Sequence, residues 1–158
     1  MSTPIVPAEV FLDGDHGAAA VSQVARRVVR DLSTASALAT LDLGGRRQIL
    51  GWHGADPLPL LRTVGAMSRP NSECVQVPET SPELTAAGIG AHVSVPIASD
   101  DPGALMTLWT VSSLRRWFDH DEIHHLRLLA DRISRIIAAR AMIVLDREDQ
   151  PTAVVTLS

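Results

Sequence analysis

Helical spacing of apolar residues marks a region near each end of the chain. Between Asp15 and Leu32, apolar side chains recur every three or four residues, with arginines beside them. A second stripe runs from Asp121 to Arg140, preceded by Asp119, which has capping-box spacing to Glu122. The apolar members of this second stripe are Ile123, Leu126, Leu129, Ala130, Ile133, Ile136, Ile137 and Ala141. We therefore predict two long amphipathic helices.

Short runs of strand-forming residues separate these two helices. Turn-forming residues join consecutive runs at Gly44-Gly45 and at the sequence SDDPG, which favours antiparallel pairing. Short helices are expected at Pro57–Met67 and Pro82–Ala87, each with a proline in its first turn. The expected strands are Ser36–Leu43, Gln48–His53, Glu73–Val77, His92–Ala98 and Ala104–Val111. The pattern predicts an α+β fold in which a central antiparallel sheet carries both terminal helices on one face.

Residues 15–140 should form one domain, because 158 residues with 46% hydrophobic content can build one sizeable core. Residues 1–14 contain two prolines and are expected to form a flexible arm. Residues 141–158 form a C-terminal extension, for which two readings stay open. Met142–Leu145 and Ala153–Leu157 could pair as a small hairpin, or the last helix could continue into this segment.

The second half of the chain carries an ordered series of short motifs. They are Gly88-Ile89, Val95-Pro96-Ile97, Ala104-Leu105, Arg116-Trp117-Phe118 and Asp121-Glu122. In this order they resemble the C-terminal half of a GAF domain, and the resemblance extends over roughly residues 15–139. It implies a small-molecule sensing fold in which the ligand lies between one sheet face and the overlying short helices and loops.

Strand alternation selects candidate ligand-binding residues. On the strand at 92–98, His92 and Ser94 share one face while valines occupy the other. We expect them to contact a small molecule together with Trp109, Met106, His53 and Cys74. For His53 and His92 the alternative is a structural histidine at the sheet rim, and for Trp109 and Met106 it is a place in the core. In the Arg116-Trp117-Phe118 motif, Trp117 is expected to pack the preceding hairpin onto the last helix.

Cys74, together with the absence of lysine, helps to distinguish between the functions that the resemblance to GAF domains implies. The branch that reduces free methionine sulfoxide needs a resolving cysteine besides the nucleophile, and this chain has a single cysteine. Covalent bilin binding uses a cysteine in a context that Glu73-Cys74-Val75 does not match. The cyclic-nucleotide signature includes a lysine, and all the basic residues here are arginines. The cofactor therefore stays unknown.

A metal site is not indicated by the histidines of the last helix. His120 and His124 lie four residues apart and could supply two zinc ligands if a third came from elsewhere. An exposed helix start with acidic residues that compensate the helix dipole explains the same residues. No HExxH motif is present.

Net charge and hydropathy restrict the partners. The formal charge of −4 argues against a nucleic-acid-binding surface, and no apolar stretch is long enough to span a membrane. No signal-peptide pattern is seen, so a cytoplasmic location is expected.

Leu126, Leu129 and Ile136 widen the apolar arc of the last helix, which predicts a homodimer through the terminal helices.

Together these features predict a non-enzymatic sensory or regulatory protein that binds a small molecule or a partner protein in signal transduction. Two alternatives stay open. One is a haem-based redox or gas sensor that uses His92 or His53. The other is a small thiol-dependent reductase that uses Cys74.

Overall fold

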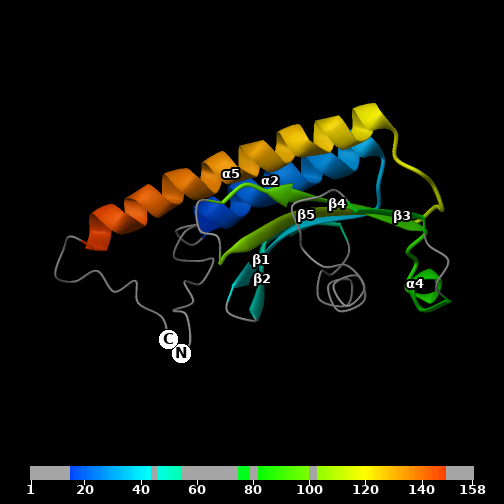
Figure 1. Ribbon diagram of the computed structural model, residues 1–158, viewed down its shortest axis with the longest axis horizontal. Helices are drawn as coiled ribbons and strands as arrows, with labels where there is room; N and C mark the ends of the chain where they lie inside the picture. The colour runs from blue at the N-terminus through cyan, green and yellow to red at the C-terminus, as the bar shows by residue number, and fades with distance from the viewer. Residues whose placement is uncertain (1–14, 44–45, 55–74, 79–81, 100–102, 149–158) are drawn as a thin grey trace.

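Two long helices and a five-stranded sheet form the protein in a computed structural model that describes residues 15–43, 46–54, 75–78, 82–99 and 103–148 (Figure 1). The elements in chain order are α2 (Asp15–Leu32), β1 (Ser36–Leu43), β2 (Arg46–His53), β3 (Val75–Pro78), α4 (Pro82–Ala86), β4 (Ala91–Ile97), β5 (Leu105–Ser112) and α5 (His120–Glu148). The helix expected at Pro57–Met67 lies outside the described residues.

The sheet has the strand order β2-β1-β5-β4-β3, and every neighbouring pair is antiparallel. Figure 1 shows α2 and α5 lying side by side across one face of this sheet. The predicted α+β architecture, with both long helices on one face of an antiparallel sheet, is confirmed. Pairing of β1 with β5 brings the two halves of the chain together at the centre of the sheet.

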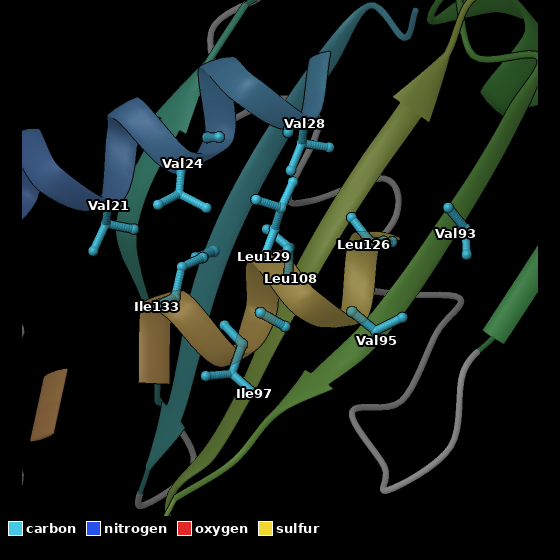
Figure 2. Packing of buried hydrophobic residues seen from close by; sticks show 14 of the residues in the cluster. Val21, Val24, Val28, Val93, Val95, Ile97, Leu108, Leu126, Leu129 and Ile133 are labelled. Atoms are coloured by element: carbon cyan, nitrogen blue, oxygen red, sulfur yellow. The ribbon is translucent and has the colours of Figure 1, made fainter. Parts of the chain in front are cut away.

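The main core lies between the sheet and the two long helices (Figure 2). Alternate residues of β1, β4 and β5 point into it, and the helices contribute the stripes that their apolar spacing predicts. Its fully buried members include Val21, Val28, Val93, Val95, Leu108, Leu126 and Ile133. This cluster is called the helix-side core below.

Leu126 and Leu129 belong to the helix-side core, which corrects the basis of the dimer prediction. They are 0% and 3% exposed, so they do not form a surplus apolar surface. Among the residues of this helix whose burial is described, the large exposed hydrophobic side chain is Leu128, at 50%. A helix with Leu126 and Leu129 on the inner side presents Leu128 outward, because two residues correspond to a rotation of about 200°.

The capping box at the start of α5 forms as the sequence predicts. The Asp119 carboxylate accepts a hydrogen bond from the Glu122 backbone N–H at 2.8 Å, and Glu122 accepts one from the Asp119 N–H at 3.0 Å. The helix then continues without a break to Glu148. Of the two readings of the C-terminal extension, helix continuation therefore holds for residues 141–148, and Ala153–Leu157 lies outside the described residues.

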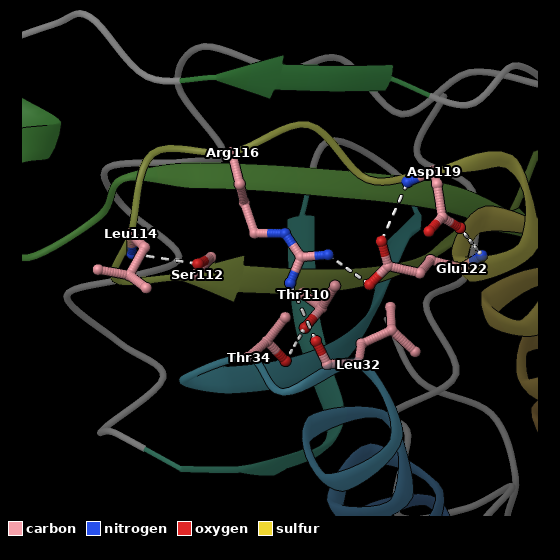
Figure 3. A network of polar contacts seen from close by, with 8 residues as sticks. All are labelled: Leu32, Thr34, Thr110, Ser112, Leu114, Arg116, Asp119 and Glu122. Atoms are coloured by element: carbon pink, nitrogen blue, oxygen red, sulfur yellow. Dashed lines mark hydrogen bonds and ion pairs between the residues drawn. The ribbon is translucent and has the colours of Figure 1, made fainter.

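Arg116 connects the β5–α5 linker to both long helices (Figure 3). Its guanidinium forms an ion pair with Glu122 and donates a hydrogen bond to the Leu32 carbonyl, the last residue of α2. It also lies 4.4 Å from the ring centroid of Phe118, which is buried. Trp117, in contrast, is 68% exposed, so Phe118 and not Trp117 anchors this linker.

Glu122 has two separable roles, and substitutions should distinguish them. We expect Glu122→Gln to lower the free energy of unfolding by about 1 kcal/mol, because an amide keeps the cap acceptor but loses the ion pair with Arg116. Glu122→Ala removes both interactions and should cost about 2 kcal/mol. Urea denaturation measures both values. Equal losses for the two variants would contradict a contribution from the cap, and Asp121→Asn, at an exposed neighbouring position, is the control.

Candidate functional site

The face of the sheet opposite the long helices carries a second, smaller cluster of buried residues. Its apolar members are Leu38, Trp109, Val111 and Ile89, the last of which follows α4 in the chain. Leu38 alternates along β1 with the residues that enter the helix-side core, and Trp109 does the same along β5. This surface is called the ligand face below.

Polar side chains form a row across the centre of the ligand face. Trp109 of β5 pairs with Ser94 of β4 on one side and with Leu38 of β1 on the other. One step along β5 on the same face, Thr107 pairs with Thr40 of β1. Directly opposed side chains in antiparallel strands lie about 5 Å apart, so these groups are immediate neighbours.

The indole of Trp109 is fixed by a hydrogen bond within this row. Its Nε1 donates to the Thr40 Oγ1 at 3.0 Å, and both side chains are almost fully buried. A buried indole usually finds such an acceptor, because an unpaired N–H is costly away from water.

Imidazole and hydroxyl groups complete the row. His92 is 1% exposed, and Ser94 and Thr107 are each 3% exposed. His92 lies on the same face as Ser94, two residues earlier in β4, and pairs with Val111. The Thr107 Oγ1 is buried and has no hydrogen-bond partner among the residues that the structure describes. A buried hydroxyl of this kind is a ready partner for a polar atom of a ligand.

Of the six predicted site residues, three share the ligand face. These are His92, Ser94 and Trp109. Met106 lies in the helix-side core, so its expected place beside Trp109 was wrong: successive strand residues point to opposite faces. His53 is exposed at the end of β2 and pairs with Ala37, whose side chain enters the helix-side core. The structure therefore does not bring His53 to His92, and Cys74 lies outside the described residues.

Two members of the row, Thr40 and Thr107, were missed by sequence reasoning. The available signal was alternation, since Thr107 shares a face with Trp109, and Thr40 shares one with Leu38. What alternation alone does not give is the register between β1 and β5, which joins residues far apart in the chain. That register places Thr40 beside the indole.

Within the described ranges, no group of three His, Cys, Asp or Glu side chains is arranged to hold a metal ion. His120 and His124 are both exposed at the start of α5.

Among the residues that the structure describes, no helix is long and apolar enough to cross a membrane. The described residues of the ligand face offer hydrogen bonding and aromatic contact, from neutral side chains and His92.

Comparison with known proteins identifies the fold. No family model matches the chain, and no curated protein matches it in sequence. Solved structures do match. A domain assigned to a two-component sensor histidine kinase of Sinorhizobium meliloti has a TM-score of 0.66 at 18% identity, over 80% of this chain and 93% of that one. The GAF domain assigned to a sensor histidine kinase of Pseudomonas syringae pv. tomato gives 0.64 at 15% identity, over 85% and 89%.

An enzyme is also among the similar structures. The type II free methionine-R-sulfoxide reductase of Thermoplasma acidophilum has a TM-score of 0.57 at 10% identity, over 76% of this chain and 91% of that one. The strand order, the two helices on one face and these similarities agree with the resemblance in the sequence motifs. The protein therefore has the fold of a GAF domain.

Proposed function

We propose that the protein is a sensory or regulatory domain that binds a small molecule on the ligand face, without catalysis. The observation that supports this most strongly is the buried row of His92, Ser94, Thr107 and Trp109 on the side of the sheet away from the long helices. If this face of the sheet served only to form a hydrophobic core, aliphatic side chains would be expected in place of these polar ones. Polar groups in this position are costly unless they serve structure or a ligand.

The row also indicates the chemistry of the ligand. It offers an indole surface, an imidazole and two hydroxyls, and none of these side chains carries a fixed charge. A compact, mainly uncharged molecule with an aromatic or apolar body and several hydrogen-bonding atoms fits this set. Met106 and His53 are not part of the proposal, because they lie elsewhere.

Binding without turnover is favoured by the cysteine content. A thiol reductase of this fold would need a second thiol to regenerate its nucleophile, and the chain has one cysteine, Cys74. Reduction of free methionine sulfoxide by this chain would therefore depend on an external thiol for the resolving step. Turnover with such a donor that disappears in Cys74→Ser would overturn the non-catalytic proposal.

A regulatory role is supported by the similar domains from sensor histidine kinases. In this protein α5 packs on β4, whose opposite face carries His92 and Ser94. A ligand that shifts β4 would move α5, and with it any surface that α5 presents to a partner. Homodimerisation through the terminal helices remains a prediction, now with Leu128 as the large exposed hydrophobic residue in the part of α5 whose burial is described.

Tryptophan fluorescence tests the proposed site, because the three tryptophans differ in position. Trp52 and Trp117 are 47% and 68% exposed, whereas Trp109 is 1% exposed. In a Trp52→Phe/Trp117→Phe background, emission reports on the ligand face alone. We expect a screen of neutral metabolites to yield a compound that changes this emission. Ser94→Val should weaken its binding about tenfold, the equivalent of about 1.4 kcal/mol.

Met106→Leu is the matched control, because Met106 is buried in the neighbouring strand but faces the helices. It should leave the affinity within about twofold of the unsubstituted value. A compound shown to bind by native mass spectrometry, yet unaffected by Ser94→Val and His92→Gln, would contradict the proposed site. Addition of haem tests the haem alternative: a Soret band that disappears in His92→Phe would support it, and no band would remove it.

A further inference from the structure

A second site lies on the helical layer, between α2 and α5. The two helices run in opposite directions, since His125 near the start of α5 meets Asp31 at the end of α2 (Figure 1). Farther along, residues from both helices line a cavity of about 400 Å³. This volume is within the usual range of small-molecule sites. The cavity is called the arginine groove below.

Four arginines line the groove: Arg26, Arg27 and Arg30 from α2, and Arg132 from α5. Arg27 and Arg30 both pair with Asp31, at 3.3 and 3.2 Å. Arg26 and Arg132 are exposed and form no ion pair within the described part of the chain. The guanidinium groups therefore outnumber the carboxylate that compensates them.

Asp31 already has several ion-pair and hydrogen-bond partners. Besides the two arginines, it accepts a hydrogen bond from the His125 Nε2 at 2.7 Å. This bond lowers the pKa of Asp31 most. Partial burial raises the pKa by a smaller amount, and hydrogen bonds from Arg30 and Arg27 lower it, so that the net shift is downward. Asp31 is thus firmly ionised at neutral pH, and a single negative charge is all it can offer to the groove.

Gathering cations around one cavity is unfavourable in the absence of an anion. Two like charges about 10 Å apart repel by roughly 0.4 kcal/mol in water and by more near a protein surface. The net charge of the whole chain is −4, so the positive groove is a local feature and not a general property of the surface. Guanidinium groups bind phosphate and carboxylate oxygens with paired hydrogen bonds, which makes a multiply charged oxyanion the matching ligand.

The remaining lining indicates that this anion has an organic part. Ala20 and Val24 from α2 and Ile136 from α5 provide apolar surface beside the arginines. Val24 is 4% exposed and belongs to the helix-side core, so this part of the groove is held in place by the packing. A two-fold contact centred on the groove would place arginines against arginines, so the homodimer predicted above would make its contact elsewhere on the terminal helices.

We propose that the arginine groove binds an organic anion with at least two phosphoryl groups, separately from the ligand on the opposite side of the sheet. The phosphoryl oxygens pair with Arg26 and Arg132, and the organic body lies against Val24 and Ile136. A ligand held by both helices fixes the position of α5 relative to α2, so it acts on the same helical layer through which a signal from the sheet would pass.

Isothermal titration calorimetry with ATP, tripolyphosphate and adenosine, in about 50 mM salt without divalent cations, tests the proposal. ATP is expected to bind, tripolyphosphate to bind about threefold or more weakly than ATP, and adenosine not to bind. In Arg26→Gln/Arg132→Gln the affinity for ATP should fall at least about tenfold. Neither arginine has an ion-pair partner in the described residues, so the melting temperature of this variant should stay close to that of the wild type.

The control variant is Arg115→Gln/Arg135→Gln, which removes the same charge from exposed positions that do not line the groove. Its affinity for ATP should stay within about twofold of wild type. Equal weakening in the two double variants would overturn the proposal, because it would reduce binding to a general effect of net charge. Failure of ATP to bind the wild type below about 5 mM would overturn it as well, and equal affinity for tripolyphosphate would overturn the role of the apolar lining.

Discussion

Leu126→Ala is expected to lower the free energy of unfolding by about 3 kcal/mol. Leu126 is 0% exposed and lies in the helix-side core with Val93 and Val95 (Figure 2). Truncation removes apolar contacts and leaves a cavity between α5 and the sheet, and the antiparallel strands below cannot collapse to fill it. Urea denaturation followed by circular dichroism gives the change in unfolding free energy.

Leu128→Ala is the matched control, since it makes the same substitution two residues farther along α5. Leu128 is 50% exposed, and its truncation should change the unfolding free energy by about 0.5 kcal/mol or less. Similar losses for the two variants would contradict the described orientation of α5. Sedimentation of Leu128→Glu tests the homodimer: a monomer–dimer equilibrium unaltered by this charge would exclude α5 at this position from the interface.

Gly90→Ala is expected to destabilise the protein by about 3 kcal/mol or more. A Cβ at Gly90 would lie 2.3 Å from the carbonyl carbon of Leu114 and 2.5 Å from the backbone nitrogen of Arg115. Both are backbone atoms, so they cannot rotate away as a side chain would. The Gly90 N–H also donates to the Ser112 carbonyl at 2.8 Å, which holds the two segments together.

Gly88→Ala separates this close approach from backbone strain. Gly88 has a φ of +81°, a conformation that favours glycine, but nothing lies within 4 Å of a Cβ placed there. Its substitution should cost about 1–2 kcal/mol, the usual penalty of the left-handed region. Thermal or urea denaturation of both variants gives the comparison. A loss at Gly88 that equals or exceeds the loss at Gly90 would show that the contact with Leu114 is not the stronger constraint.

Much of the fold is predictable from local patterns. The capping box of Asp119 and Glu122 marks the start of α5, and the alternation of His92, Val93, Ser94 and Val95 assigns both faces of β4. These predictions succeed because the physical causes act within a few residues of one another. The short helix before Gly88 is predictable for the same reason, since proline near its start and glycine after its end are local signals.

The parts that sequence reasoning did not find depend on contacts between distant segments. The hydrogen bond from Trp109 to Thr40 requires the β1–β5 register. The arginine groove requires the packing of α2 on α5, which brings Arg132 to the arginines of α2. Met106 and Leu129 show a different error. The sequence suggested a ligand pocket for Met106 and an exposed apolar surface for Leu129, but both side chains pack in the helix-side core.

The contacts between the N-terminal elements α2 and β1 and the C-terminal elements β5 and α5 have a consequence for synthesis of the protein on the ribosome. β1 completes its ladder only with β5, and α2 is tied to the segment after β5 by Arg116 and to α5 by a contact between residues 94 positions apart. The α2–β1–β2 unit therefore leaves the ribosome with unpaired strand edge and uncovered apolar surface. This unit cannot complete its sheet and its core until residues beyond Leu126 have emerged, and until then it is exposed to chaperones and to neighbouring chains. Folding of this domain is then a late event that follows translation of nearly all its core.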